Sequence, residues 1–177
     1  MDLVQLLRRA ADLAQHLAKG QRIQAHLPED EVRVDGDPNR LEQVIINLLD
    51  NAIVYAEGTK CIDLRLRVAG EQAEVVVQDY GPGIPAADLP HVFTRFYRGS
   101  SAGRRAAGGL GLGLYISHQL VAAHGGHIDV RSVRRGGYGV HHFAATGNVT
   151  LSQTGPCAWR RLRSPCVPTI MLRVARG

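Results

Sequence analysis

The amino-acid sequence predicts an α+β fold, in which helices pack on one face of a mixed, mostly antiparallel sheet to form a two-layer sandwich. Segments with helical periodicity alternate along the chain with segments that have the alternation typical of strands. Two pairs of strand-like segments are separated by short glycine-containing turns, which are typical of antiparallel hairpins. The length of 177 residues fits one domain with a buried core.

Three segments have helical periodicity. Residues 2–19 place leucine and alanine side chains at helical spacing. A second helix is expected to begin after Asp37, a good N-cap residue, with Pro38 in its first turn. Residues 110–124 predict a third helix, which a pair of glycines closes. The second helix has a wide apolar stripe made of Leu41, Val44, Ile45, Leu48, Leu49, Ala52 and Ile53.

The alternating segments predict strands at residues 21–27, 61–69, 73–79, 127–133 and 138–145. The long stretch 81–109 is rich in Gly, Pro, Arg and Ser, and a loop of this length in a compact domain is usually functional or mobile. Beyond residue 146 no clean periodicity remains. We therefore expect one domain at residues 1–146 and a poorly ordered tail at residues 147–177.

Charge and cysteine content exclude several classes of protein. The net charge is +5, but residues 147–177 contain five arginines and no acid, so the rest of the chain is neutral. A neutral body with a basic tail is a weak case for nucleic-acid binding, so no nucleic-acid partner is expected. Three cysteines without close pairing predict neither a disulfide framework nor a zinc site. Without a signal segment or an apolar run that could span a membrane, we expect a cytoplasmic protein that does not itself enter a membrane.

The second predicted helix carries a row of amides. Gln43, Asn47 and Asn51 are four residues apart and share one helix face beside the apolar stripe. An amide oxygen is a hard neutral ligand, suited to Mg²⁺ that keeps most of its water and phosphate ligands. The alternative is a polar surface stripe on an amphipathic helix.

An acid followed by glycines ends one of the predicted strands. Asp79 closes a run of β-branched residues, and Gly81 and Gly83 follow it. A carboxylate there can accept a hydrogen bond from a buried amino group such as that of adenine, and the glycines let the backbone approach a flat ring. The alternative is a plain turn. A Rossmann site is disfavoured, because Pro85 leads into a loop and no acid follows about twenty residues on.

A third motif, Gly-Gly-Leu-Gly-Leu-Gly-Leu at 108–114, opens the last predicted helix. Glycines before a helix expose backbone N–H groups that can bind phosphate, although close helix packing would also explain them. No Gly-Lys-Ser/Thr sequence is present, so this is not a Walker loop. The chain has only two lysines, so arginine must supply any cation that faces phosphate. The preceding loop offers Arg95, Arg98, Arg104 and Arg105.

The order of these motifs is more specific than any one of them. The chain contains Asn-Leu-Leu-Asp-Asn-Ala, Asp-Tyr-Gly-Pro-Gly-Ile, Val-Phe-Thr-Arg-Phe-Tyr-Arg and Gly-Leu-Gly-Leu-Gly-Leu. This series resembles the asparagine, first glycine, phenylalanine and second glycine boxes of two-component sensor histidine kinases. That family belongs to the larger group with gyrase, the Hsp90 chaperones and the mismatch-repair ATPases. The resemblance covers about residues 2–145 and implies a Bergerat-type ATP-binding domain.

The resemblance also implies roles for individual residues. Asn47 and Asn51 would lie near Mg²⁺ and the phosphates of ATP, and Asp79 would accept the adenine amine. The lid over the nucleotide would be the loop at about 95–109, anchored by Phe93 and Phe96, with Arg98 as a catalytic cation. The remaining nucleotide-binding residues would be Tyr55, Gly81, Gly83, Ile84, Gly109, Leu110, Gly111, Leu112 and Gly113.

Asn47 also bears on the reaction type. Hydrolysing relatives in the larger group place Glu there, one turn before the Mg²⁺ asparagine, to activate water. An amide cannot accept that proton, so fast hydrolysis is not expected. Transfer of the γ-phosphoryl group to a protein histidine suits this site, with catalysis by positioning and charge neutralisation.

The chain departs from the family in three ways. Val54 stands where a basic residue is usual, which removes one phosphate contact. The last strand has Gly-Tyr-Gly-Val-His-His-Phe at 137–143 in place of the usual Gly-x-Gly-Thr-x-Phe. No phosphoacceptor histidine followed by an acid is present, and His16 is better explained as a surface helix residue.

The expected partners are therefore a histidine-bearing dimerisation and phosphoacceptor protein or domain and, indirectly, a response regulator. The chain would be an excised domain of a larger kinase or half of a split kinase, and Met1 at the domain edge slightly favours the split form. The alternative function is a non-catalytic or regulatory ATP-binding module, similar to an anti-sigma protein or a decayed kinase.

Overall fold

The computed structural model describes residues 1–56, 58–70, 72–99, 109–135 and 138–148, and from Val133 onward it describes the backbone alone. Part of the predicted lid, residues 100–108 with Arg104 and Arg105, lies outside the described residues. So do residues 149–177, most of the predicted tail, with two of the three cysteines.

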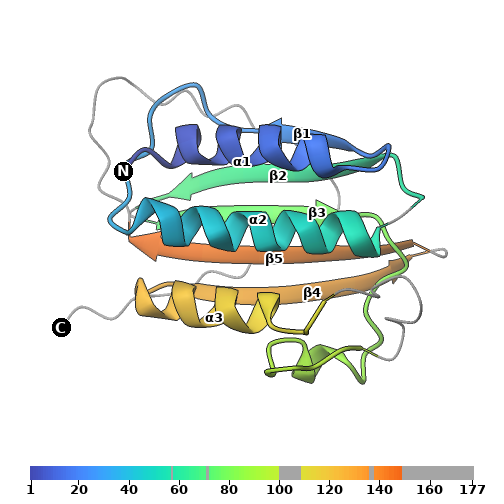
Figure 1. Cartoon of the computed structure of the whole chain (residues 1–177). Coiled ribbons are helices and arrows are strands. Elements are labelled where there is room, and N and C mark those ends of the chain that lie inside the picture. The colour runs from blue at the N-terminus through green and yellow to red at the C-terminus, as the bar shows by residue number, and fades with distance from the viewer. Residues whose placement is uncertain (57, 71, 100–108, 136–137, 149–177) are drawn as a thin grey trace.

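The chain folds into one sheet with helices on one of its faces (Figure 1). The helices are α1 (Leu3–Leu17), α2 (Pro38–Tyr55), α3 (Gly113–Ala123) and the short 3₁₀ helix η1 (Leu89–His91). The strands are β1 (Arg22–His26), β2 (Cys61–Ala69), β3 (Gln72–Asp79), β4 (His127–Arg135) and β5 (Tyr138–Asn148). They are ordered β1-β2-β3-β5-β4, with β1 parallel to β2 and every other pair antiparallel. The predicted two-layer α+β fold is therefore confirmed.

Local sequence signals explain where the helices begin. Asp37 caps α2 as predicted, because its carboxylate accepts hydrogen bonds from the backbone N–H groups of Asn39 and Arg40. The third helix begins at Gly113, three residues later than predicted at 110. Gly111 has φ +68°, a left-handed conformation that an α-helix cannot contain, so the helix starts only after it.

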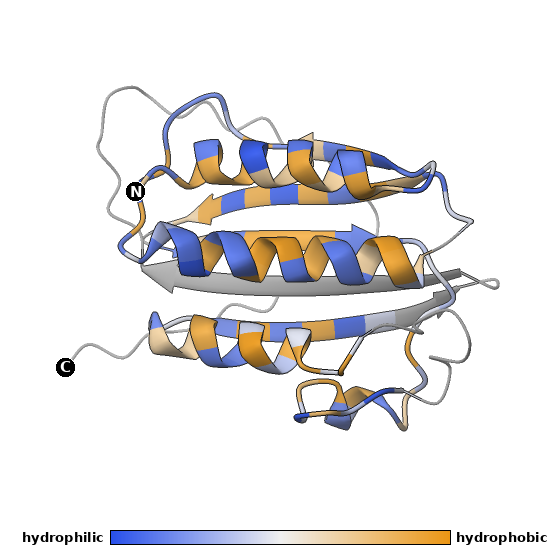
Figure 2. Cartoon of the chain, in the orientation of Figure 1, coloured by the Kyte–Doolittle hydropathy of each residue, from blue (hydrophilic) through white to orange (hydrophobic). Residues whose placement is uncertain are grey.

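The core lies between the helices and the sheet. The apolar stripe of α2 is buried from Val44 to Ile53 and packs against the helix-facing side chains of β2 and β3. Figure 2 shows the alternation of hydrophilic and hydrophobic residues along β2 that produces this face. Because β1 and β2 are parallel, the chain must cross over between them, and α2 makes this crossover. As a result, the C-terminal end of α2 lies beside the C-terminal end of β3 and the start of α3 (Figure 1).

Candidate functional site

The two predicted asparagines of α2 lie on its α3-facing side. The side-chain amide of Asn47 donates a hydrogen bond of 3.4 Å to the hydroxyl of Ser117 on α3. The amide of Asn51 donates at 2.7 Å to the backbone carbonyl of Asn47, one turn earlier. Both side chains are half-buried, whereas Gln43 is exposed. Of the three amides in the predicted row, only Asn47 and Asn51 therefore lie in this partly enclosed position.

The second glycine motif lies directly against these amides. A Cβ atom on Gly113 would lie 3.8 Å from Nδ2 of Asn51 and 3.9 Å from Cγ of Asn47. Gly113 is the first residue of α3, and no side chain among the described residues caps this helix end. The first N–H groups of a helix have no partner within it and favour negative charge. Amide oxygens beside an uncapped helix N-terminus fit a metal-bound phosphate.

Asp79 is buried at the end of β3. It continues the row of Ala73, Val75 and Val77 that faces the helices, and its exposed fraction is 1%. One carboxylate oxygen accepts a hydrogen bond of 2.8 Å from the N–H of Gly81. Burial raises the pKa of Asp79 to about 7, and this hydrogen bond partly opposes the rise. Near neutral pH the protonated and ionised forms of the carboxyl group are therefore comparably populated, and in either form an oxygen can accept a hydrogen bond from a buried donor.

Gly81 allows the chain to pass closely beneath the end of α2. A Cβ atom there would lie 2.8 Å from the carbonyl oxygen of Tyr55 and 3.0 Å from Oδ1 of Asp79. These distances leave no room for a side chain. Tyr55, the last residue of α2, is partly exposed beside this contact. Two of the predicted residues, Tyr55 and Asp79, therefore lie directly against a third, Gly81.

The chain turns sharply after Gly81. Gly83 has φ +82°, in the left-handed region that favours glycine. The next N–H, of Ile84, donates a hydrogen bond of 2.8 Å to the hydroxyl of Ser132 on β4. Sequence reasoning missed Ser132, because this contact joins residues far apart in the chain and no local pattern marks it. It also missed Ser117, which is completely buried on α3 four residues after Gly113.

The phenylalanine motif forms a compact segment next to α3. Phe93 packs against the core, and its ring lies 5.3 Å from that of His118 on α3. Phe96 differs from this arrangement: its side chain is 57% exposed, and the guanidinium of Arg95 lies 4.7 Å from its ring centroid. The backbone of Phe96, which has φ +63°, holds this segment beside the second glycine motif, because its N–H donates a hydrogen bond of 3.0 Å to the carbonyl of Gly111.

Asp88 and Tyr97 stabilise the same segment. The Tyr97 hydroxyl donates a hydrogen bond of 2.9 Å to the buried carboxylate of Asp88, which sequence reasoning missed. Burial and this carboxylate raise the pKa of Tyr97, so its hydroxyl remains a donor at neutral pH. Arg98, the predicted catalytic cation, follows as an exposed side chain.

The remaining predicted residues lead from this segment into α3. Gly109 is exposed, and the side chain of Leu110 is 72% exposed. Gly111 lies against the backbone of Phe96 and Tyr97, where a Cβ atom would come within 2.6 Å of the Tyr97 carbonyl oxygen. Leu112 is half-buried just before α3. The structure therefore brings Gly113 against Asn47 and Asn51, and Gly81 against Tyr55 and Asp79, near the C-terminal end of α2. Arg98, Gly109 and Leu110 lie exposed on the segments that flank residues 100–108.

Comparison with known proteins identifies the fold family. Residues 36–147 match the family described as histidine kinase-, DNA gyrase B-, and HSP90-like ATPase. The chain belongs to this family. The matched residues contain both asparagines, Asp79 and both glycine motifs. None of the helices in the described part of this ATPase-family chain is long and apolar enough to cross a membrane.

Curated relatives in this ATPase family are sensor kinases. The chain is 43% identical over 103 residues to the circadian input-output histidine kinase CikA of Synechococcus elongatus, covering 56% of this chain and 14% of CikA. It is 38% identical over 139 residues to the sensor protein SphS of the same organism, covering 75% of this chain and 34% of SphS. It thus spans about a third or less of the length of these relatives.

Solved structures agree with this assignment. A mycobacterial sensor histidine kinase, MprB, superposes with a TM-score of 0.73 at 28% identity, covering 85% of this chain and 99% of that structure. Full-length ShkA in complex with AMPPNP superposes with a TM-score of 0.72 at 26% identity, covering 87% of this chain and 31% of ShkA. The predicted identity, an ATP-binding domain of the sensor-histidine-kinase type, is confirmed.

Proposed function

We propose that this chain binds Mg²⁺·ATP at the end of the sheet and donates the γ-phosphoryl group to a histidine on a separate phosphoacceptor protein or domain. The observation that carries the proposal is the convergence of two features. The buried Asp79 beside Gly81 can recognise an amino group of a flat ring, and Asn47 and Asn51 lie against the uncapped start of α3. The relatives named as histidine kinases support it, as does the AMPPNP bound to ShkA.

Each group has a distinct role in this proposal. Asp79 accepts the hydrogen bond of the adenine amine, with Tyr55, Gly83 and Ile84 beside the base. The N–H groups at the start of α3 and Gly109–Leu112 bind the phosphates. Asn51 and Asn47 offer amide oxygens to Mg²⁺, which supplies charge neutralisation when bound. No cluster of three His, Cys, Asp or Glu in the described residues could hold a metal, so the ion would depend on phosphate and water as well.

The residue at position 47 favours transfer over hydrolysis. An amide cannot take a proton from water, and in this structure the amide of Asn47 is a hydrogen-bond donor to Ser117. The exposed Phe96 and Arg98 lie on the segment next to α3 and are proposed to complete the site when the acceptor histidine is present. A response regulator would receive the phosphoryl group afterwards. ATP as substrate agrees with a cytoplasmic location.

One observation favours a second function, a regulatory ATP-binding module. Val54, a half-buried aliphatic residue in the last turn of α2, stands where a basic residue would contact phosphate in the resembling kinases. Such a module would bind ATP without transferring its phosphoryl group. We also propose that the ATP-binding domain runs to the end of β5 at Asn148, two residues beyond the predicted boundary at 146, and that residues 149–177 form a separate tail.

The deciding experiment uses γ-labelled ATP, Mg²⁺ and candidate histidine-bearing proteins. We expect acid-labile, base-stable label on the partner, little ATP turnover without it, and loss of labelling in Asn51→Ala. The matched control is Asn39→Ala in the first turn of α2, away from the site, which should label the partner normally. ATP binding without transfer to any candidate would favour the regulatory module, and rapid hydrolysis without a partner would contradict the kinase proposal.

A further inference from the structure

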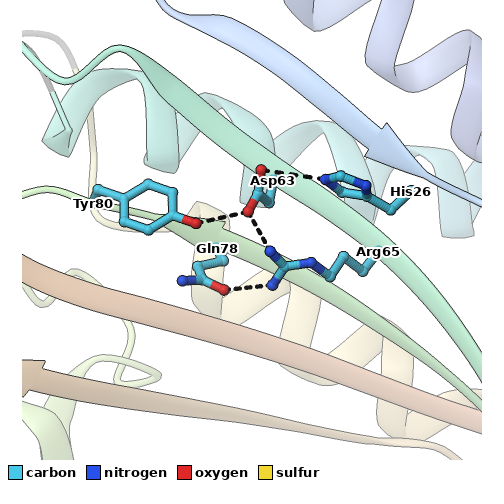
Figure 3. Close-up of polar contacts among 5 residues, drawn as sticks. All are labelled: His26, Asp63, Arg65, Gln78 and Tyr80. Atoms are coloured by element: carbon cyan, nitrogen blue, oxygen red, sulfur yellow. Dashed lines mark hydrogen bonds and ion pairs between the residues drawn. The ribbon is translucent and has the colours of Figure 1, made fainter. Parts of the chain in front are cut away.

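A polar network lies on the outer face of the sheet, which we define as the face opposite the helices. Asp63 is 4% exposed, although it alternates along β2 with the core residues Ile62 and Leu64 and so points away from the core. Figure 3 shows it surrounded by His26 of β1, Arg65 of β2, and Tyr80 just after β3. A buried carboxylate needs such partners, because an unpaired charge away from water is costly.

The contacts converge on one carboxylate oxygen. Oδ2 of Asp63 accepts hydrogen bonds from the Tyr80 hydroxyl at 2.7 Å and from the Arg65 guanidinium. Arg65 also donates at 2.6 Å to the side-chain oxygen of Gln78, which lies opposite Asp63 in the register of β2 and β3. His26 is 3.6 Å from the other oxygen but is half exposed, so its contribution is screened by solvent.

Tyr80 joins this network to the proposed nucleotide site. The ladder of β3 ends at Asp79, so Tyr80 lies just beyond the backbone hydrogen bonds of this strand. The hydrogen bond from its side-chain hydroxyl to Asp63 on β2 holds it to the sheet. Burial and the Asp63 carboxylate raise the pKa of Tyr80 to about 12, so the hydroxyl remains a donor across the physiological range.

The segment Asp79–Tyr80–Gly81 is consequently held from both faces of the sheet. On the helix side, Gly81 lies tightly against Tyr55 at the end of α2. On the outer side, Tyr80 is tied to Asp63. Between them, the N–H of Gly81 donates to Oδ1 of Asp79 and sets the orientation of that carboxylate. Preorganised hydrogen-bonding groups bind more tightly, because less freedom is lost when the ligand arrives.

We propose that Tyr80 and Asp63 are positioning residues. From the outer face of the sheet they orient Asp79, whose carboxyl group recognises the nucleotide base on the helix side. The proposal rests on the proposed function in that it takes adenine as the group recognised. Neither residue contacts the nucleotide. Their effect reaches the site through the backbone of Gly81, and it concerns the base and leaves phosphate binding unchanged.

The test compares wild type, Tyr80→Phe and Asp63→Asn in the full chain. Tyr80→Phe removes one hydroxyl and keeps the ring, and Asp63→Asn keeps the shape while weakening the acceptor. The matched control is Arg67→Gln, which removes an exposed pair with Glu74 from the same strand and the same outer face. Circular dichroism verifies that each variant folds.

Two measurements separate positioning from general loss of structure. Hydrogen exchange of the Gly81 amide in the nucleotide-free protein should become several-fold faster in both variants and remain unchanged in the control. Affinity for ATP should fall about threefold to tenfold, the loss expected for one hydrogen bond. Affinity for inosine triphosphate, which has an oxygen in place of the adenine amine, should stay nearly constant.

Each outcome decides the proposal. Unchanged exchange at Gly81, or an equal loss of affinity for both nucleotides, would overturn it, because the network would then have no specific effect on Asp79. Wild type without ATP affinity would refute the proposed function separately. In that case alone, faster exchange at Gly81 in Tyr80→Phe would still establish that the network positions this segment.

Discussion

Asp79 combines nearly complete burial with an ionisable group, and these two properties oppose each other in the folded chain. Burial disfavours the carboxylate, so its pKa rises from 3.8 to about 7. A fold gains nothing from such a residue unless its carboxyl group serves another purpose. Acceptance of a ligand's amino group supplies that purpose. Asp79 then lowers the free energy of unfolding of the ligand-free chain but contributes to ligand binding.

The pH dependence of the stability of the ligand-free chain should reveal this cost. An acid with a raised folded pKa stabilises the fold below its unfolded pKa, near 3.8, and this contribution is lost as the pH rises through about 7. Asp79→Asn removes the charge and keeps an oxygen for the Gly81 N–H. At pH 8 the variant should be more stable by up to about 4 kcal/mol, a difference that closes toward pH 4.

Denaturant unfolding at a series of pH values measures this difference. The control is Asp50→Asn, an exposed acid on α2, which should show no comparable pH-dependent gain. The same Asp79→Asn variant should lose most of its ATP affinity. A variant no more stable than wild type at pH 8 would show that the carboxylate is well stabilised in the fold and contradict this account.

At the scale of elements, Gly111 couples the phenylalanine segment to the start of α3. It is left-handed, its carbonyl accepts the N–H of Phe96, and its Cα lies against the backbone of Tyr97. The Asp88–Tyr97 hydrogen bond holds the other side of this segment. These contacts set where the N–H groups of α3 lie relative to Asn47 and Asn51.

Gly111→Ala should therefore lower stability more than its backbone conformation alone explains. Gly125→Ala is the matched control, because its φ of +70° is nearly the same as the +68° of Gly111 but a Cβ atom there would meet nothing within 4 Å. We expect a loss of about 1–2 kcal/mol in the control. In Gly111→Ala the Cβ would clash with the Tyr97 carbonyl, so stability and ATP affinity should both fall further. Thermal unfolding and nucleotide titration measure both, and equal losses in the two variants would refute the coupling.

At the scale of the whole molecule, the proposed nucleotide would bridge the elements that meet at this end of the sheet. It would touch the ends of α2 and β3, the start of α3 and the phenylalanine segment. A ligand that binds the folded state alone stabilises it in proportion to the logarithm of its concentration. The whole domain, and not one loop, should therefore respond to ATP.

Mg²⁺·ATP at a hundred times its dissociation constant should add about 2.7 kcal/mol of stability. For a chain of this size, the melting temperature would rise by roughly 5–10 °C. Differential scanning fluorimetry measures the shift, with Asp79→Asn as the control that should not respond. An absent shift in wild type, or an equal one with inosine triphosphate, would contradict adenine recognition at Asp79.

Much of the fold could be predicted from the sequence because the relevant signals are local. Helical spacing located α1 and α2, Asp37 marked the first turn of α2, and alternation located β2 and β3 within one residue of their observed ends. The start of α3 was wrong by three residues, because a run of glycines and leucines does not reveal which glycine is left-handed.

The sequence by itself determined which chemical groups the proposed site contains, since the order of its motifs is written in the chain. Only the tertiary structure decided which of them meet and what holds them. The contact of Gly113 with Asn47 and Asn51, the bond from Ile84 to Ser132 and the network of Asp63 with Tyr80 join residues from different elements. Such contacts depend on how α2 packs against α3 and on the register between strands, which arise from the packing of the whole core.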